Sequence, residues 1–270
     1  MSKIEIKNLY AEYEDKNGSF LALKDISFQV KEGEFVSLIG SSGCGKSTLL
    51  SILQGINFPS SGIAAIDGNP ITGPGTNRGV VFQHYSLFPW MTTRTNIAFG
   101  LKQSHQNLSR RQRYETADAF LAKVGLSGFG HKYPYQLSGG MQQRAAIARA
   151  LAMNTDILLM DEPFGAIDAK NRTNMQELLL ALWEGDGKSL KKTVVFVTHD
   201  IDEAIFLSDR IIMLTNSPGQ IGKEYDVPFP RPRIHSAMRE APSYIHLRNM
   251  LMALFYDENS GKAADGEYVI

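Results

Sequence analysis

The sequence has almost no cysteine, since Cys44 is the only thiol among its 270 residues. One cysteine cannot form an internal disulfide, so disulfide bonds do not stabilise the fold of this chain. The composition is instead typical of a protein that works in a reducing compartment.

The chain also lacks net charge and long apolar runs. Lysine plus arginine equals aspartate plus glutamate at 28 each, which gives no overall attraction to nucleic acid or anionic lipid. No stretch approaches the roughly 20 uninterrupted apolar residues that span a bilayer. The first ten residues, MSKIEIKNLY, alternate apolar and polar side chains and do not form the apolar core of a signal peptide. If this protein serves a membrane, we expect it to do so as a peripheral subunit.

Short apolar runs alternate with stretches of helical spacing along the chain. Period-two patterns at Ile4, Ile6, Phe28 and Val30 predict two half-buried strands near the N-terminus. Later runs predict fully buried strands of a mainly parallel sheet at residues 35–39, 80–82, 157–160, 194–197 and 211–214. Strands that alternate with helices indicate an α/β domain with ligands at the carboxyl ends of the strands.

Two regions depart from this alternation. Residues 88–153 hold helix formers and no buried-strand run, so we predict a mostly helical insertion. After residue 214, four prolines predict an irregular tail, followed by a helix over 244–255 and a frayed end. We therefore predict one large domain over 1–240, which includes the helical insertion, and a short helical extension over 241–270.

A glycine-rich segment, GSSGCGKST, directly follows the predicted strand 35–39 and precedes a helix-like LLSIL. This is the P-loop pattern, in which backbone N–H groups and a helix N-terminus surround phosphate oxygens. Lys46 would reach the β- and γ-phosphates, and the Ser47 hydroxyl would bind Mg²⁺. Within the loop, Cys44 is either a small residue that fits or a redox group, and the first is favoured. The expected phosphate-binding residues are Gly40, Ser41, Ser42, Gly43, Cys44, Gly45, Lys46, Ser47 and Thr48.

Polar side chains follow two further predicted strands. The run ILLMDEP places Asp161, a candidate Mg²⁺ ligand, and Glu162, a candidate base for the attacking water, at a strand end. Alone, two acids after an apolar run are weak evidence, but beside a P-loop they indicate catalysis. His199 follows the run TVVFV and would hydrogen-bond the γ-phosphate, although a histidine after a strand is often purely structural.

The segment LSGGMQQR, residues 137–144, precedes another helix-like stretch. Ser138 is a suitable N-cap, and Gly139 and Gly140 permit close backbone approach, so this helix start is a second anion-binding end. One chain already has a complete phosphate loop. The second site therefore predicts binding of a partner's nucleotide, and hence a dimer.

In this order, the motifs resemble those of the ATP-binding-cassette (ABC) family over nearly the whole chain. The resemblance implies a P-loop NTPase fold with a RecA-like, mainly parallel core, an N-terminal antiparallel β subdomain and a helical subdomain insertion. It also implies that Gln83 senses Mg²⁺ and the attacking water, that Ser138 and Gly140 contact the opposite subunit's γ-phosphate, and that Asp168 links the two sites. Adenine would stack on Tyr13, with Tyr10 as an alternative and core packing as a competing role for Tyr13.

Two segments resemble the nitrate, sulfonate and taurine branch of importers: HYSLFPW after Gln83, and a tail that contains SPGQI and PRPR. This branch implies ATP-driven import by a dimer, most simply a homodimer, at the cytoplasmic face of the inner membrane. The implied partners are two membrane permease subunits and, indirectly, a solute-binding protein, with no nucleic acid. Residues 87–90, LFPW, would dock a permease helix, or else pack against the helical insertion.

The alternatives are an ABC exporter subunit and a non-transport ABC ATPase acting on DNA or ribosomes. The latter class is disfavoured by the single cassette, the single cysteine and the absence of a basic stripe. The solute stays open among nitrate, taurine, a sulfonate and a vitamin precursor. Two departures from the family pattern, AID at 166–168 and the long segment 185–193, predict a harmless volume-conserving swap and a surface loop or hairpin.

Overall fold

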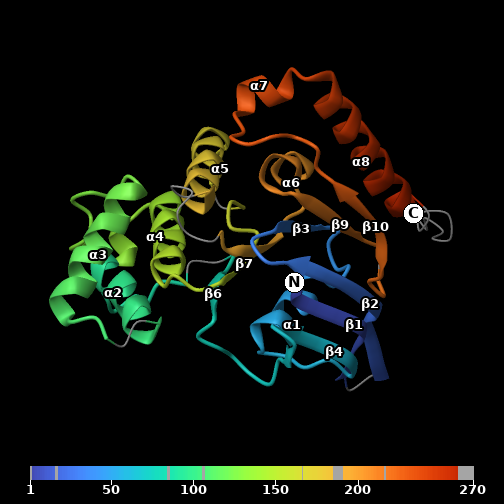
Figure 1. Cartoon of the computed structure of the whole chain (residues 1–270), viewed down its shortest axis with the longest axis horizontal. Coiled ribbons are helices and arrows are strands. Elements are labelled where there is room, and N and C mark those ends of the chain that lie inside the picture. Colours follow the sequence, from blue (N-terminus) through green and yellow to red (C-terminus); the bar gives the residue numbers. More distant parts are fainter. Residues whose placement is uncertain are drawn as a thin grey trace, which may run out of the picture. The chain divides into compact units, whose positions relative to one another are not determined.

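The computed structural model describes residues 2–15, 18–83, 86–104, 107–165, 167–184, 191–215 and 217–260. It divides the chain into two compact units, Met1–Gly73 with Phe196–Ile270, and Pro74–Val195. Their helices and strands are labelled along the chain in Figure 1. The first unit is therefore built from both ends of the chain, and the second from its middle.

The first unit contains the expected antiparallel sheet near the N-terminus. Its strand order is β2-β1-β4-β5, with β1 at Ser2–Asp15, β2 at Gly18–Lys31, β4 at Ser61–Ile66 and β5 at Asn69–Pro70. The period-two pattern is confirmed, because Ile4 lies opposite Val30, Ile6 lies opposite Phe28, and all four side chains are buried. Strand β4 was not predicted, because only its second half, Ala64–Ile66, is buried.

A second group of strands in this unit leads to the phosphate loop. The β3 strand, Phe35–Ile39, is buried throughout and pairs in parallel with β9, Arg210–Leu214, as a near-continuous apolar run predicts. Helix α1, Lys46–Gln54, follows the loop after β3, and helix α6, Ile201–Leu207, precedes β9. The β8 strand, Thr193–Val197, carries the chain from the second unit into the first.

The prediction of an irregular tail after residue 214 is wrong. Strand β10, Ile221–Asp226, pairs with β9 in antiparallel orientation, and helix α7, His235–Arg239, precedes helix α8, Pro242–Ser260. The prolines do not prevent this, because β10 contains none of them and the segment from 228 to 232 is fixed by arginine side chains instead. Arg233 donates hydrogen bonds to the carbonyl oxygens of Ile205, Phe206 and Ser208 at the end of α6.

The second unit contains a parallel strand pair and a helical region. Strand β6, Arg78–Val81, pairs in parallel with β7, Ile157–Asp161, and helix α5, Ala169–Glu184, follows β7. The helical insertion is confirmed for the described residues by α2 at Thr93–Ser104, α3 at Arg110–Lys123, the 3₁₀ turn η1 at Pro134–Gln136, and α4 at Gly139–Ala152.

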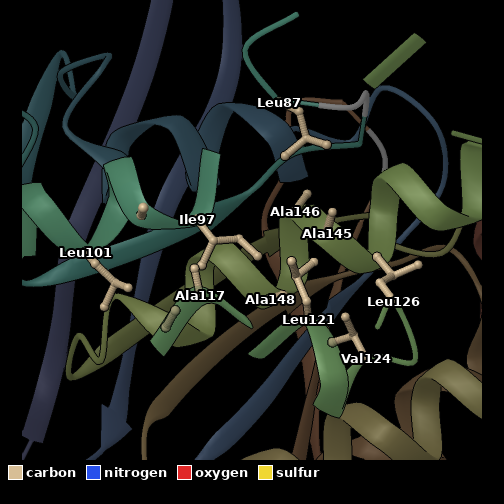
Figure 2. Close-up of a cluster of buried hydrophobic side chains, with 12 residues drawn as sticks. Leu87, Ile97, Leu101, Ala117, Leu121, Val124, Leu126, Ala145, Ala146 and Ala148 are labelled. Carbon is tan, nitrogen blue, oxygen red and sulfur yellow. The ribbon is translucent and has the colours of Figure 1, made fainter. Parts of the chain in front are cut away.

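Helices α2, α3 and α4 share one apolar core. Figure 2 shows Ile97 and Leu101 of α2, Ala117 and Leu121 of α3, and alanines of α4 within one cluster of buried side chains. The core face of α4 is made of small side chains, which let its backbone approach α2 and α3 closely. They are Ala145, Ala146, Ala148 and Ala152.

Two predictions fall largely outside the described residues. The loop or hairpin predicted at 185–193 is described only from residue 191, and the frayed end beyond 260 is not described. Within the described part of the chain, no helix combines the length and the apolar character needed to cross a bilayer.

The turn at Gly62 makes a sharp stability prediction. Gly62 has a φ of 86°, and a Cβ atom there would lie 2.1 Å from the carbonyl oxygen of Asn8 in β1. Gly68→Ala is the matched control, because Gly68 also has a positive φ, of 75°, but open space around the added atom. We expect Gly68→Ala to lower the free energy of unfolding by about 1 kcal/mol, from backbone strain alone.

Gly62→Ala should cost several times more than this control, because the β1 backbone must move. Denaturant unfolding of both variants measures the difference. Equal losses of stability would contradict the close packing of β4 against β1.

Candidate nucleotide-binding and catalytic site

The phosphate loop of the first unit joins the end of β3 to the start of α1. Gly43 and Gly45 have φ values of 81° and 93°, which only glycine adopts without strain. Gly45 is the N-cap of α1 and provides no side-chain cap, so the first-turn N–H groups of α1 are not satisfied by a capping side chain. This arrangement suits an anion, which the helix dipole also favours.

Lys46 brings a buried positive charge to this loop. Its Nζ donates hydrogen bonds to the carbonyl oxygens of Gly40 and Ser41, at 2.7 and 2.8 Å. The ammonium group thus lies against the loop that its own residue follows, beside the first turn of α1. Ser47, the next residue, is exposed, and its role as a metal ligand stays a prediction.

The phosphate loop is tightly packed around Cys44, Gly40 and Gly45. The Cys44 side chain is buried, and a Cβ atom on Gly40 would come within 2.6 Å of its Sγ. A Cβ on Gly45 would lie 2.5 Å from the Leu23 side chain. A small buried thiol therefore fits the loop, as the non-redox interpretation of Cys44 expects, and the glycine positions do not tolerate larger residues.

Tyr13 is placed in β1 as a half-exposed aromatic side chain. It is 39% exposed and lies opposite Phe20 of β2, which is 54% exposed, so the two rings share one face of the sheet. Asn57 Nδ2 donates to the Tyr13 hydroxyl at 3.3 Å. Core packing of Tyr13 does not fit this exposure. Tyr10, the alternative, is only partly accessible.

His199 lies between β8 and α6, with an exposed side chain. Its two neighbours are anchored to α6: Thr198 Oγ1 donates to the buried Glu203 carboxylate at 2.7 Å, and Asp200 is the N-cap of the helix. The backbone around His199 is thus held on both sides.

In the second unit, Glu162 and Gln83 meet directly. Asp161 is the last residue of β7, and Glu162 follows it with a φ of 41°, a left-handed conformation that costs a non-glycine residue roughly 1–2 kcal/mol. Gln83 Nε2 donates to Glu162 Oε2 at 3.2 Å. Strain of this kind is concentrated at functional sites. Sequence reasoning named both residues but did not predict their hydrogen bond.

The start of α4 and the segment before α5 line one polar cavity of about 450 Å³. Ser138 is the N-cap of α4, as predicted, and its Oγ accepts a hydrogen bond from the Met141 N–H at 3.3 Å. Asp168 borders the same cavity and accepts hydrogen bonds from the backbone and the side chain of Asn171. The helix start and Asp168 are therefore brought together, as the composite-site hypothesis requires.

Sequence reasoning missed further residues of this cavity. Asn171 and Asn174 of α5 line it, together with Arg144 of α4. The sequence did contain a signal for them, because Asp168, Asn171 and Asn174 follow one another at intervals of three residues. This spacing brings successive side chains close together at the start of a helix.

The first part of the LFPW segment is packed inside the second unit, and its last part is exposed. Leu87 is only 6% exposed and belongs to the core of α2, α3 and α4, so its assignment to a docking surface is wrong. Phe88 packs edge-on against Phe99, and the Asn96 side-chain amide hydrogen-bonds both the N–H and the carbonyl of Phe88. Trp90 is 69% exposed, so the exposed part of the segment lies after Phe88.

The phosphate loop between β3 and α1 defines the class of protein as a P-loop nucleoside triphosphatase. The family model described as "ABC transporter" matches residues 23–165. The chain therefore belongs to the ABC transporter family, and it is an ATPase.

Individual relatives agree with this assignment. The nitrate import ATP-binding protein NrtD of Synechococcus elongatus is 47% identical over 88% of this chain and 86% of its own length. The bicarbonate transport ATP-binding protein CmpC of the same species is also 47% identical, over 92% of this chain and 37% of its own length. A solved dimer of the ATP-binding cassette MJ0796, bound to ADP and Pi after hydrolysis, superimposes with a TM-score of 0.74 at 36% identity, covering 84% of this chain and all of that one.

Removal of the Lys46 ammonium group tests the phosphate loop. Lys46→Ala should weaken ATP binding at least 100-fold, because the charge nearest the loop carbonyls and the first turn of α1 is lost. Calorimetric titration with ATP measures this affinity. Lys24→Ala, at an exposed lysine of β2, is the matched control and should bind ATP like the parent. Unchanged affinity in Lys46→Ala would exclude this loop as the ATP site.

Proposed function

We propose that this chain drives the import of a small solute of the nitrate, sulfonate or taurine class through separate membrane subunits. The observation that carries the proposal is 47% identity to a nitrate import ATP-binding protein over 88% of the chain. Identity to a bicarbonate transport protein at the same level supports a small oxyanion as the solute. The tail segment PRPR, which the sequence assigned to this branch, is bonded through its arginines to α6 and Asp209.

In the proposed mechanism, ATP binds with its phosphates at the N–H groups of residues 40–48 and at Lys46, and its adenine on Tyr13. The fit rests on the uncapped start of α1 and on the half-exposed Tyr13 ring. Both features are properties of this chain's own backbone and side chains.

Mg²⁺ would be held by Ser47, Asp161 and Gln83 together with phosphate oxygens. When bound, the metal would neutralise charge on the β- and γ-phosphates. Among the described residues, no group of three or more His, Cys, Asp and Glu side chains is placed to hold a metal. A donor set of one hydroxyl, one carboxylate, one amide and phosphates fits Mg²⁺, which is rarely held by an all-protein cage.

Glu162 would accept a proton from the water that attacks the γ-phosphate. Gln83 holds the Glu162 carboxylate through the bond at 3.2 Å, so it fixes the direction in which the base points. His199 would donate a hydrogen bond to the γ-phosphate and stabilise the charge that develops there.

A second copy of the chain would complete each site. The cavity at the start of α4 would take the γ-phosphate of the ATP bound by the partner, through Ser138, Gly139 and Gly140. Asp168 on its rim would connect the two sites. The solved dimers of a related cassette support this assembly.

The remaining proposed partners are two permease subunits, reached at the cytoplasmic face of the inner membrane, and a solute-binding protein that acts through them. The exposed Trp90 ring, with Pro89 before it, is the proposed contact with the permease. Because Asn96 fixes the Phe88 backbone two residues earlier, this contact would be presented on a rigid loop.

Substitution of the base separates ATP binding from ATP hydrolysis. Glu162→Gln should lower kcat at least 100-fold while ATP affinity changes little, because the amide cannot accept the proton of water. The same variant should accumulate as an ATP-dependent dimer, which size-exclusion chromatography with light scattering detects. Glu115→Gln, on the exposed face of α3, is the control. Normal turnover in Glu162→Gln would exclude Glu162 as the base.

Co-purification of the tagged chain from its native membrane tests the transport assignment. A multi-span permease and a solute-binding protein should be recovered, and the latter can be titrated with nitrate, taurine and sulfonates. Trp90→Ala should reduce this recovery at least tenfold with ATP affinity unchanged, whereas Phe129→Ala, another exposed aromatic, should not. Recovery of a permease alone would favour export, and recovery of DNA or ribosomes would contradict transport.

A further inference from the structure

Helix α6 begins two residues after His199, with Asp200 as its N-cap, and is bonded to both neighbours of His199. The Asp200 carboxylate accepts hydrogen bonds from the N–H groups of Asp202 and Glu203, at 2.9 and 3.1 Å. On the other side, Thr198 Oγ1 donates to Glu203 Oε2 at 2.7 Å and accepts from the Asp200 N–H at 3.0 Å. The path of the chain through His199 is therefore set by the position of the first turn of α6.

The C-terminal helix α8 binds that same turn. Asp202 Oδ1 accepts a hydrogen bond from the Tyr244 hydroxyl at 2.6 Å and another from Arg248 Nε at 2.7 Å. Tyr244 and Arg248 are four residues apart and so share one face of α8. The same helix anchors itself through Leu247 and Leu251, which are buried.

The charges of Asp202 and Arg248 favour the contact between α6 and α8. Burial acts to raise the pKa of Asp202, but the hydrogen bonds from Arg248 and Tyr244 outweigh it and hold the pKa below its ordinary value. Burial and the neighbouring Asp202 carboxylate raise the pKa of Tyr244, so its hydroxyl stays protonated and remains a donor. Asp202, Tyr244 and Arg248 line one cleft. Arg239 of α7 lines it as well, and its positive charge helps to lower the pKa of Asp202.

The far end of α6 is fixed separately. Arg233 bonds the carbonyl oxygens of its last turn, and Arg231 bonds Leu207 O and the Asp209 carboxylate. Both arginines precede α7. The short helix is thus held at its end by the segment before α7, and at its start by α8.

We propose that Tyr244 and Arg248 are positioning residues for ATP hydrolysis, which act through Asp202 to hold His199 in register with the γ-phosphate. The inference rests on the proposed role of His199. By this inference the C-terminal extension contributes to catalysis. A shift of α8 would move the first turn of α6, and His199 would move with it.

The test compares ATP hydrolysis by the purified full chain and by a Tyr244→Phe/Arg248→Ala double variant. We expect kcat to fall about tenfold while KM for ATP stays within about twofold, because positioning at the γ-phosphate is lost and nucleotide binding is not. Arg248→Gln, which alters one partly exposed side chain, should show a smaller fall in the same direction and guards against a double variant that folds poorly. The control is Asn249→Ala, which alters an exposed α8 side chain lining the same cleft and should leave kcat unchanged.

A structural role would give a different result. If α8 only stabilised the fold, the number of ATP sites per chain in a titration would fall in proportion to the rate, and that outcome overturns the proposal. An unchanged kcat in the double variant overturns it as well, as does an equal fall in Asn249→Ala. His199→Ala separates this inference from the proposed function: a normal rate in that variant refutes the role of His199 itself, whereas a slow His199→Ala beside a normal double variant refutes only the contribution of α8.

Discussion

A buried ammonium group beside a helix start is the constraint on which the phosphate loop depends. Lys46 carries its charge into the fold and satisfies it with two carbonyl oxygens of the loop, Gly40 O and Ser41 O. The same loop contains Gly43 and Gly45, whose positive φ values other residues adopt only with strain. Helix α1 starts beside this loop without a capping side chain, which favours an anion there. The charge, the glycines and the buried strand β3 are thus parts of one arrangement.

The candidate site residues are divided between the two units. The first holds the phosphate loop, Tyr13 and His199, and the second holds Gln83, Glu162 and the cavity at the start of α4. Each group is held by local bonds inside its own unit. Such local fixation keeps a catalytic side chain in place before the substrate arrives, which lowers the cost of ordering it during the reaction.

Much of the fold could be predicted because buried strands have a simple signature. The strands at β3, β7 and β9 are continuous apolar runs, and their predicted bounds match the structure to within one residue. Strand β4 and strand β10 escaped prediction because their exposed residues break the pattern, and β10 also lies among prolines. The prediction for Leu87 was wrong for a related reason. An apolar side chain suits a partner's surface as well as the core formed by α2, α3 and α4, so its character does not distinguish between them.

The candidate site residues were named one by one from the sequence, but the bonds between them were not predicted. Glu162 was proposed from its place after a buried strand, and Asp168 from the resemblance to the ABC family, because motifs report residue types at fixed intervals. The bond from Gln83 to Glu162 joins residues 79 positions apart, and no local pattern encodes it. The same holds for Arg248 and Asp202, which are brought together only when α8 folds against α6.

The alanine face of α4 has a mechanical consequence. An alanine side chain has no rotamers, so an interface built from alanines cannot absorb a displacement by rearranging its side chains. A displacement of α2 would therefore meet little compliance on the α4 side of the interface and would be transmitted along α4 toward Ser138, the residue on which α4 begins. Replacing these small residues by long flexible ones would turn a stiff linkage into a compliant one, even where the folded shape survived.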